Sequence, residues 1–202
     1  NGLAYSSPSF SVTILILSLA TTIAFQILSN FANDYGDGVK GTDNNDRIGP
    51  ARVLQQGLLS RKELKKGIQI TVASSLILSF SLILIAFDSS ELLYVLIFVA
   101  LAIASVYAAI KYTVGENAYG YRAFGDVFVF VFFGGVSVLG SYFLQNNTFS
   151  IELILPATSI GLLSVGVLNL NNMRDLETDK KSNKITIAVL LGSSYSKIYH
   201  TF

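Results

Sequence analysis

Five long stretches of this chain contain no charged side chain, and this feature limits the possible folds more than any other. The stretches cover residues 10–32, 67–87, 92–110, 127–144 and 153–170. Each is close to the roughly 20 residues that a helix needs to cross a bilayer. Backbone groups in lipid must form hydrogen bonds within their own segment, so helix is the expected structure for all of the stretches. The sequence therefore predicts an all-α, polytopic transmembrane bundle with about five full spans.

The fourth stretch is the one that could be mistaken for a strand. It opens with alternating Val and Phe residues over 127–133. Its length without a charge favours a helix over a strand. The composition agrees with a membrane protein, because 51% of the residues are hydrophobic and only 13% are charged. There is no Cys, which excludes disulfides and thiolate metal sites.

The positive charge is concentrated in three of the connecting loops. Loops 33–66, 111–126 and 171–184 hold all but one of the 14 Lys and Arg residues, and loops 88–91 and 145–152 hold none. Alternate loops lie on the same side of a membrane, and the side rich in Lys and Arg is cytoplasmic. We therefore expect a multi-pass protein of the cell inner (plasma) membrane, with its polar loops on the cytoplasmic side.

A cluster of Asn and Asp side chains follows the first apolar stretch. Asn30, Asp34 and Asp37 are three or four residues apart, so they would share one face of a helix, with Asn33 beside Asp37. Carboxylates this close together repel each other unless a positive charge lies between them. Oxygen ligands of this kind suit Mg²⁺, which often bridges to the phosphates of a substrate.

A second cluster of the same kind follows the fifth stretch. Asn171, Asp175 and Asp179 recur every four residues and form one stripe on a helix. The basic residues that flank this stripe are Arg174, Lys180 and Lys184. Four spans separate the two clusters, so both would face the same compartment. Carboxylates with Mg²⁺, with Lys and Arg beside them, favour a diphosphate site next to an apolar bundle, although charged residues at a helix end are also common as a solvated surface.

The two Asp-rich segments resemble those of a known family. Asn33-Asp34-x-x-Asp37 and Asp175-x-x-x-Asp179 are similar to the motifs of UbiA-type intramembrane prenyltransferases. Further segments that carry the resemblance are 33–43, 47–57, 121–126, 171–179 and 183–186. The similarity is greatest to the branch that acts on 1,4-dihydroxy-2-naphthoate in menaquinone biosynthesis. The resemblance implies a UbiA-type fold of nine transmembrane helices, so residues 1–202 are expected to form a single prenyltransferase domain that is incomplete at both ends.

The resemblance also implies a reaction. A polyprenyl group would pass from polyprenyl diphosphate to 1,4-dihydroxy-2-naphthoate, with loss of CO₂ and diphosphate, to give demethylmenaquinone. The catalytic carboxylates would bind Mg²⁺ as the cofactor, one ion at Asp34 and Asp37 and another at Asp175 and Asp179. The expected partners are the two substrates and the lipid bilayer, with no nucleic acid. Two alternatives stay open: a different aromatic acceptor such as 4-hydroxybenzoate, and a cation-coupled membrane transporter.

Several further residues are assigned to the site by the same resemblance. Tyr107 and Lys111 match a catalytic Tyr-x-x-x-Lys segment at a cytoplasmic helix end, although Tyr and Lys are also common there as interfacial anchors. The residues expected to bind substrate are Asn30, Asn33, Arg47, Arg52, Tyr112, Arg122, Asp126, Asn171, Arg174, Lys180 and Lys184.

Two features of that set, the arginines and Asp126, allow more than one interpretation, and two nearby tyrosines lie outside the set. The arginines Arg47, Arg52 and Arg122 would contact the naphthoate carboxylate or the diphosphate, or would only set the topology. Asp126 stands where the family more often has Glu, which shortens the reach of the carboxylate. The nearby Tyr119 and Tyr121 are interpreted as aromatic-belt residues at the membrane interface.

Overall fold

Helices make up most of the protein in the computed structural model, which describes residues 1–42, 48–50 and 52–201. Five segments are long and apolar enough to cross a membrane, which confirms the expected all-α transmembrane bundle. The long helices are α1 (Val12–Lys40), α2 (Arg61–Ala86), α3 (Leu92–Lys111) and α6 (Ile154–Arg174). The fourth span consists of α4 (Gly125–Val129), the π-helical segment η3 (Phe130–Gly140) and α5 (Ser141–Asn146).

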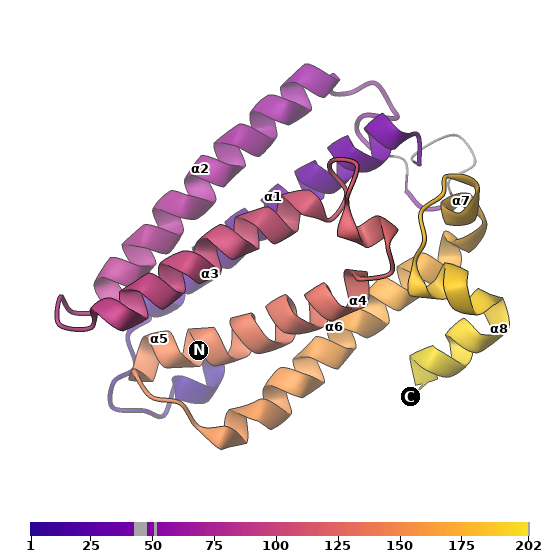
Figure 1. Ribbon diagram of the computed structural model, residues 1–202. Coiled ribbons are helices and arrows are strands. Elements are labelled where there is room, and N and C mark those ends of the chain that lie inside the picture. Colours follow the sequence, from indigo (N-terminus) through magenta and orange to yellow (C-terminus); the bar gives the residue numbers. More distant parts are fainter. Residues whose placement is uncertain (43–47, 51, 202) are drawn as a thin grey trace.

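The remaining elements are short and connect or follow the spans. They are η1 (Gly2–Ala4), η2 (Tyr119–Tyr121), η4 (Ile151–Leu153), α7 (Leu176–Lys181) and α8 (Ile187–Thr201). Within α8 the backbone breaks at Gly192, whose φ of 73° lies in the left-handed region. Figure 1 shows α7 and α8 gathered near the end of the bundle where α1 and α6 finish.

The spans pack as two groups of neighbouring helices (Figure 1). Helix α1 packs against both α2 and α3, and α6 packs against η3 and α8. A close approach between η3 and α6 depends on Gly134, because a Cβ there would lie 2.5 Å from the Ala157 carbonyl oxygen and 2.8 Å from Gly161 Cα. Small residues at helix contacts are the usual means of close packing in membranes. The expected helical structure of the fourth stretch is confirmed, because the stretch lies within α4, η3 and α5.

The buried apolar core lies at the end of the bundle away from the Asp-rich clusters. It contains Ile14 near the start of α1 with Leu82, Ile83 and Phe87 at the end of α2, together with Leu144 of α5. Large apolar side chains elsewhere on the spans face outward, as expected for helices whose surroundings are lipid.

The loop ends near the clusters are fixed by backbone hydrogen bonds. Helix α1 ends at Lys40 and is capped by Gly41 (φ 76°), whose N–H donates to the Asp37 carbonyl. The segment before α4 pairs with the segment before α8: Ala123 N–H donates to the Ile185 carbonyl (2.7 Å), and Ile185 N–H donates to the Tyr121 carbonyl (3.3 Å). This pairing brings residues from distant parts of the chain to the end of α1.

Candidate active site

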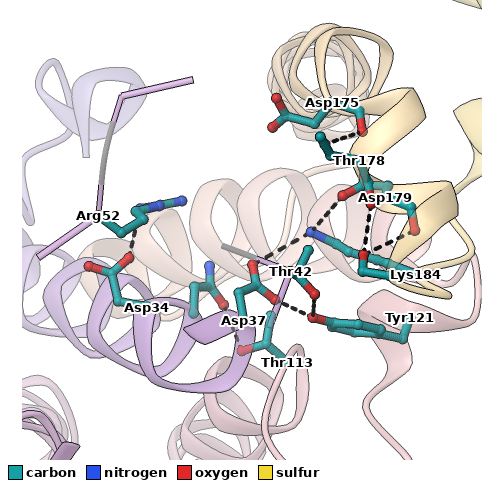
Figure 2. Close-up of polar contacts among 12 residues, drawn as sticks. Asp34, Asp37, Thr42, Arg52, Thr113, Tyr121, Asp175, Thr178, Asp179 and Lys184 are labelled. Atoms are coloured by element: carbon teal, nitrogen blue, oxygen red, sulfur yellow. Dashed lines mark hydrogen bonds and ion pairs between the residues drawn. The ribbon is translucent and has the colours of Figure 1, made fainter. Parts of the chain in front are cut away.

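The two Asp-rich clusters meet at Lys184. Its Nζ lies 3.5 Å from Asp37 Oδ2 at the end of α1 and 3.6 Å from Asp179 Oδ1 on α7. Figure 2 shows the two carboxylates reaching toward this ammonium from different elements. Asp37 is 4% exposed and Asp179 is 2% exposed, so both negative charges need a counter-charge close by. One shared lysine therefore joins two motifs that are far apart in the sequence.

The other two aspartates each contact an arginine. Asp34 Oδ1 lies 2.8 Å from Arg52 Nη1, and Figure 2 shows Asp34 directed toward Arg52 rather than toward Lys184. Asp175 accepts two hydrogen bonds from its neighbour Arg174, at 2.8 and 2.7 Å. Gly49 lies against the same guanidinium, because a Cβ at that position would be 2.9 Å from Arg174 Nη2. The connection between α1 and α2 therefore touches the second cluster.

Burial affects the titration of the second cluster. Desolvation raises the pKa of Asp179 to about 6, the ammonium of Lys184 acts in the opposite direction, and the charges of Asp175 and Asp37 add to the rise. A carboxyl with this pKa keeps its charge at neutral pH and takes up a proton under mildly acidic conditions.

Tyr121 is a member of the site that the sequence interpretation missed. Its hydroxyl donates to Asp37 Oδ1 (2.7 Å) and lies 2.6 Å from Thr42 Oγ1. The aromatic-belt interpretation of Tyr121 is therefore wrong, because the hydroxyl is directed at a carboxylate and not at a membrane surface. One sequence feature could have identified Tyr121 as a site residue: it is the first residue of segment 121–126, which carries the family resemblance.

A close contact with Thr113 fixes the Asp-rich turn of α1. Thr113 Oγ1 donates to the Ala32 carbonyl (3.0 Å), with Asn33 Oδ1 3.4 Å away. Gly36 makes the approach possible, because a Cβ there would lie 2.4 Å from Thr113 Oγ1 and 2.7 Å from its backbone carbon. Gly36, which lies between Asp34 and Asp37, therefore allows the segment after α3 to pack directly against α1.

Tyr112 and Asp126 lie beside the clusters, on either side of η2. Burial raises the pKa of Tyr112 to about 12, and the charges of Lys184, Asp37, Asp126 and Asp179 all act on its hydroxyl. The Tyr112 ring packs over Gly125, where a Cβ would lie 3.2 Å from Cε2. Asp126 is buried at the start of α4 and accepts a hydrogen bond from Tyr199 of α8 at 2.9 Å.

Tyr107 and Lys111 lie apart from the aspartates. Tyr107 is 60% exposed. Both residues line a shallow cavity of about 270 Å³ with Leu76, Ile103, Val106 and Ile110. In the described part of the chain, neither residue forms a hydrogen bond or an ion pair with the four aspartates.

Four other residues assigned to the substrate lie at the edge of the site or outside it. Asn30 is exposed and accepts a hydrogen bond from Gln26 (3.3 Å), and Asn171 and Lys180 are exposed. Arg122 is exposed and donates to Asn117. The prediction for Arg47 lies outside the residues that the structure describes.

The donor chemistry of the site fits Mg²⁺. Over residues 1–42, 48–50 and 52–201, no three His, Cys, Asp or Glu side chains form a group that could hold a metal ion. Mg²⁺ is commonly held by one or two carboxylates together with waters and substrate phosphates, so a larger protein cage is not required. Asp37 and Asp179 place carboxylate oxygens on either side of the Lys184 ammonium, and the carboxylates of Asp34 and Asp175 lie at the edges, each paired with an arginine.

A family model described as "UbiA prenyltransferase family" matches residues 2–202. The 1,4-dihydroxy-2-naphthoate octaprenyltransferase of Haemophilus influenzae is 47% identical over 95% of this chain and 61% of its own length. The enzyme of the same name from Escherichia coli is 46% identical over 98% of this chain and 64% of its own length.

UbiA prenyltransferase domain-containing protein 1 of Gallus gallus is 24% identical over 93% of this chain and 54% of its own length. No solved structure matches. The chain spans less than two thirds of the length of the two bacterial relatives.

Proposed function

Since the chain belongs to the UbiA prenyltransferase family, we propose that the full-length protein is a Mg²⁺-dependent aromatic prenyltransferase. The proposed reaction transfers a polyprenyl group from polyprenyl diphosphate to 1,4-dihydroxy-2-naphthoate. CO₂ and diphosphate leave, and the product is a demethylmenaquinone. The names and the identity of the two bacterial relatives support this choice of acceptor.

The contact of Lys184 with both Asp37 and Asp179 is the observation that supports the proposal most directly. The ammonium is 3.5 Å from one carboxylate and 3.6 Å from the other, so the ends of α1 and α7 lie close enough for one diphosphate to reach both. A transporter would place its ion site near the bilayer midplane. Here the carboxylates lie at helix ends with basic residues beside them, as a lipid diphosphate would need.

The aspartates and the basic residues of the site have different proposed roles, namely metal binding and phosphate binding. Bound Mg²⁺ would supply positive charge that stabilises the leaving diphosphate. Asp34 and Asp37 are proposed to hold one ion, and Asp175 and Asp179 the other. Lys184 and Arg174 would then turn from the carboxylates to the phosphate oxygens, because an ammonium and a guanidinium both donate well to phosphate.

The proposed location follows from the distribution of charge. The chain forms a multi-pass membrane protein with five apolar helices. We propose the inner (plasma) membrane as its location, with the aspartates on the cytoplasmic side, where the positive-inside rule puts the loops rich in Lys and Arg.

The test uses the full-length protein in liposomes with labelled polyprenyl diphosphate and each acceptor in turn. We expect prenylated product and CO₂ release with 1,4-dihydroxy-2-naphthoate, and loss of both when EDTA removes divalent ions. Asp34→Ala and Asp175→Ala should abolish turnover without preventing membrane insertion. Lys65→Ala, at an exposed position of α2, is the charge control and should turn over as the wild type does.

The outcomes separate the alternatives. Product with 4-hydroxybenzoate and none with the naphthoate would show that the acceptor is wrong. Cation flux without release of diphosphate would favour a transporter. Full activity of either Asp variant would remove that residue from the proposed metal role.

A further inference from the structure

The Tyr121 hydroxyl lies in a short hydrogen-bond chain that ends on a carboxylate of the site. A phenol has one proton to donate, and that proton is directed to Asp37 Oδ1 at 2.7 Å. At the 2.6 Å contact with Thr42, the threonine must therefore be the donor and the Tyr121 oxygen the acceptor. The chain runs from Thr42 through Tyr121 to Asp37, and it fixes the direction of one Asp37 oxygen.

The ring of the same tyrosine holds the cations of the site. Lys40 Nζ lies 3.7 Å from the ring centroid and Lys184 Nζ lies 5.6 Å from it. Both distances are within the range in which an aromatic face attracts an ammonium. Lys40 is three residues after Asp37 on α1 and therefore lies on the same face of that helix. One side chain thus contacts a carboxylate and two ammonium groups.

The backbone around Tyr121 is held on both sides. Tyr121 N–H donates to the Ala118 carbonyl (3.1 Å), and the Tyr121 carbonyl accepts from Ile185 N–H (3.3 Å). Ile185 is the residue after Lys184, so the pairing sets the position of Tyr121 relative to that lysine. The backbone of Tyr121 is therefore placed by main-chain contacts that do not involve the charged groups.

The neighbouring Tyr119 shows what a structural tyrosine in this segment does. Its hydroxyl donates to the Ala108 carbonyl at 2.7 Å, and its ring stacks on Phe128 at 3.9 Å between centroids. Burial raises the pKa of both hydroxyls, so both stay protonated at working pH. The two tyrosines belong to one turn, η2, and differ in what their hydroxyls contact.

We propose that Tyr121 is a positioning residue of the diphosphate site, which fixes the Asp37 carboxylate through its hydroxyl and seats the Lys40 and Lys184 ammonium groups on its ring. The inference rests on the proposed function, because it names what orients the carboxylate and the cations of that site. Without the hydroxyl, Asp37 keeps its contact with Lys184 and loses the second contact that fixes its direction. Tyr121 itself acts through these neighbours.

The test measures binding as well as turnover in the full-length protein. Mn²⁺ serves as the paramagnetic probe, titrated with inorganic diphosphate and followed by electron paramagnetic resonance. Tyr121→Phe keeps the ring and removes the hydroxyl, and we expect the dissociation constant for Mn²⁺ to rise by about ten-fold, the usual effect of losing one hydrogen bond to a charged group. The KM for the naphthoate should not change.

Two further variants separate positioning from folding. Tyr119→Phe is the matched control, which should lower thermal stability and leave Mn²⁺ binding at the wild-type value. Thr42→Val keeps the Tyr121 side chain and removes the donor that directs its hydroxyl, so it should weaken Mn²⁺ binding by a smaller factor. Tyr121→Leu also removes the ring, and we expect it to raise the KM for polyprenyl diphosphate beyond the value for Tyr121→Phe.

The possible results distinguish the role of Tyr121 from the proposed reaction. Wild-type Mn²⁺ binding in both Tyr121→Phe and Thr42→Val, or an equal loss in Tyr119→Phe, would overturn the role of Tyr121 and leave the proposed reaction standing. Mn²⁺ and diphosphate binding without any prenylated naphthoate would overturn the proposed reaction and leave Tyr121 as a positioning residue. A wild-type protein that binds no Mn²⁺ with diphosphate would overturn both.

Discussion

At the scale of single residues, the site neutralises its own negative charge. Asp34 contacts Arg52, Asp175 contacts Arg174, and Lys184 serves two aspartates at once. Buried carboxylates without such partners would be strongly destabilising. A metal bound with diphosphate would bring positive charge to the carboxylates and negative charge to the Lys and Arg residues. The same side chains can therefore keep the charges balanced both in the free site and in a site that holds the metal and diphosphate.

The pKa of Asp179, about 6, predicts a dependence of stability on pH. The folded protein binds a proton at this site more readily than the unfolded chain does, because the usual pKa is near 4. The stability contributed by protonated Asp179 is complete below about pH 4 and is lost as the pH rises through about 6. The total change is on the order of 3 kcal/mol, from a shift of about two units at 1.4 kcal/mol each.

The measurement compares the wild type with Asp179→Asn in detergent without divalent ions. We expect the Tm of the wild type minus that of the variant to fall between pH 4 and pH 7 and to stay level above that. The variant removes the titration at this site and leaves every other group in place. A difference that does not change with pH would contradict the assigned burial of Asp179.

At the scale of elements, the contact between α1 and the segment after α3 depends on Gly36. In Gly36→Ala the new Cβ would lie 2.7 Å from the Thr113 backbone carbon, which cannot move aside as a flexible side chain can. Overpacking of this kind typically costs about 1–3 kcal/mol. We expect a lower Tm and reduced turnover, because Asp37 follows directly on α1.

Gly38→Ala is the matched control in the same helix. There the new Cβ would lie 2.4 Å from the Leu54 Cδ2 atom, the far end of a side chain that can rotate away. Both substitutions gain about 1 kcal/mol of helix propensity, so the difference between them reports the contact alone. Equal Tm values for the two variants would argue against the close approach of Thr113.

At the scale of the whole molecule, the connections that follow α1, α3 and α6 lie at one end of the bundle, and the apolar core lies at the other. The proposed cytoplasmic location of the site predicts which loops a reagent can reach. A thiol at Glu116→Cys should react with a membrane-impermeant maleimide in inverted vesicles only. A thiol at Ser89→Cys should react in intact cells only, and both positions are exposed.

Residues 1–202 contain no Cys. Any Cys elsewhere in the full-length protein is first replaced by Ser, so that each introduced thiol is the single labelling site. Labelling after solubilisation in detergent is the control for reactivity and should be equal for the two variants. Labelling of both thiols from the same side would contradict the five-span topology, and exchanged sides would contradict the proposed orientation.

The spans, the fold class and the two Asp-rich motifs could all be predicted from the order of the amino acids. These are local properties, because a stretch such as 92–110 must be helical in lipid whatever surrounds it. The periodicity of α1 also placed Asp34 and Asp37 near one another. Two polar helix ends separated by four spans had to lie on the same side of the membrane. These parts of the site needed no knowledge of how the helices pack.

Which groups share the site depends on how the helices and loops pack against one another. Helical periodicity says which residues share a face, but not how a helix is rotated against its neighbours. Asn30 therefore faces outward although it is spaced with Asp34, and Tyr107 lines a cavity away from the aspartates. The place of Tyr121 beside Asp37 and Lys184 comes from backbone pairing between two loops, and hydrogen bonds between main-chain atoms leave no pattern in the side-chain sequence.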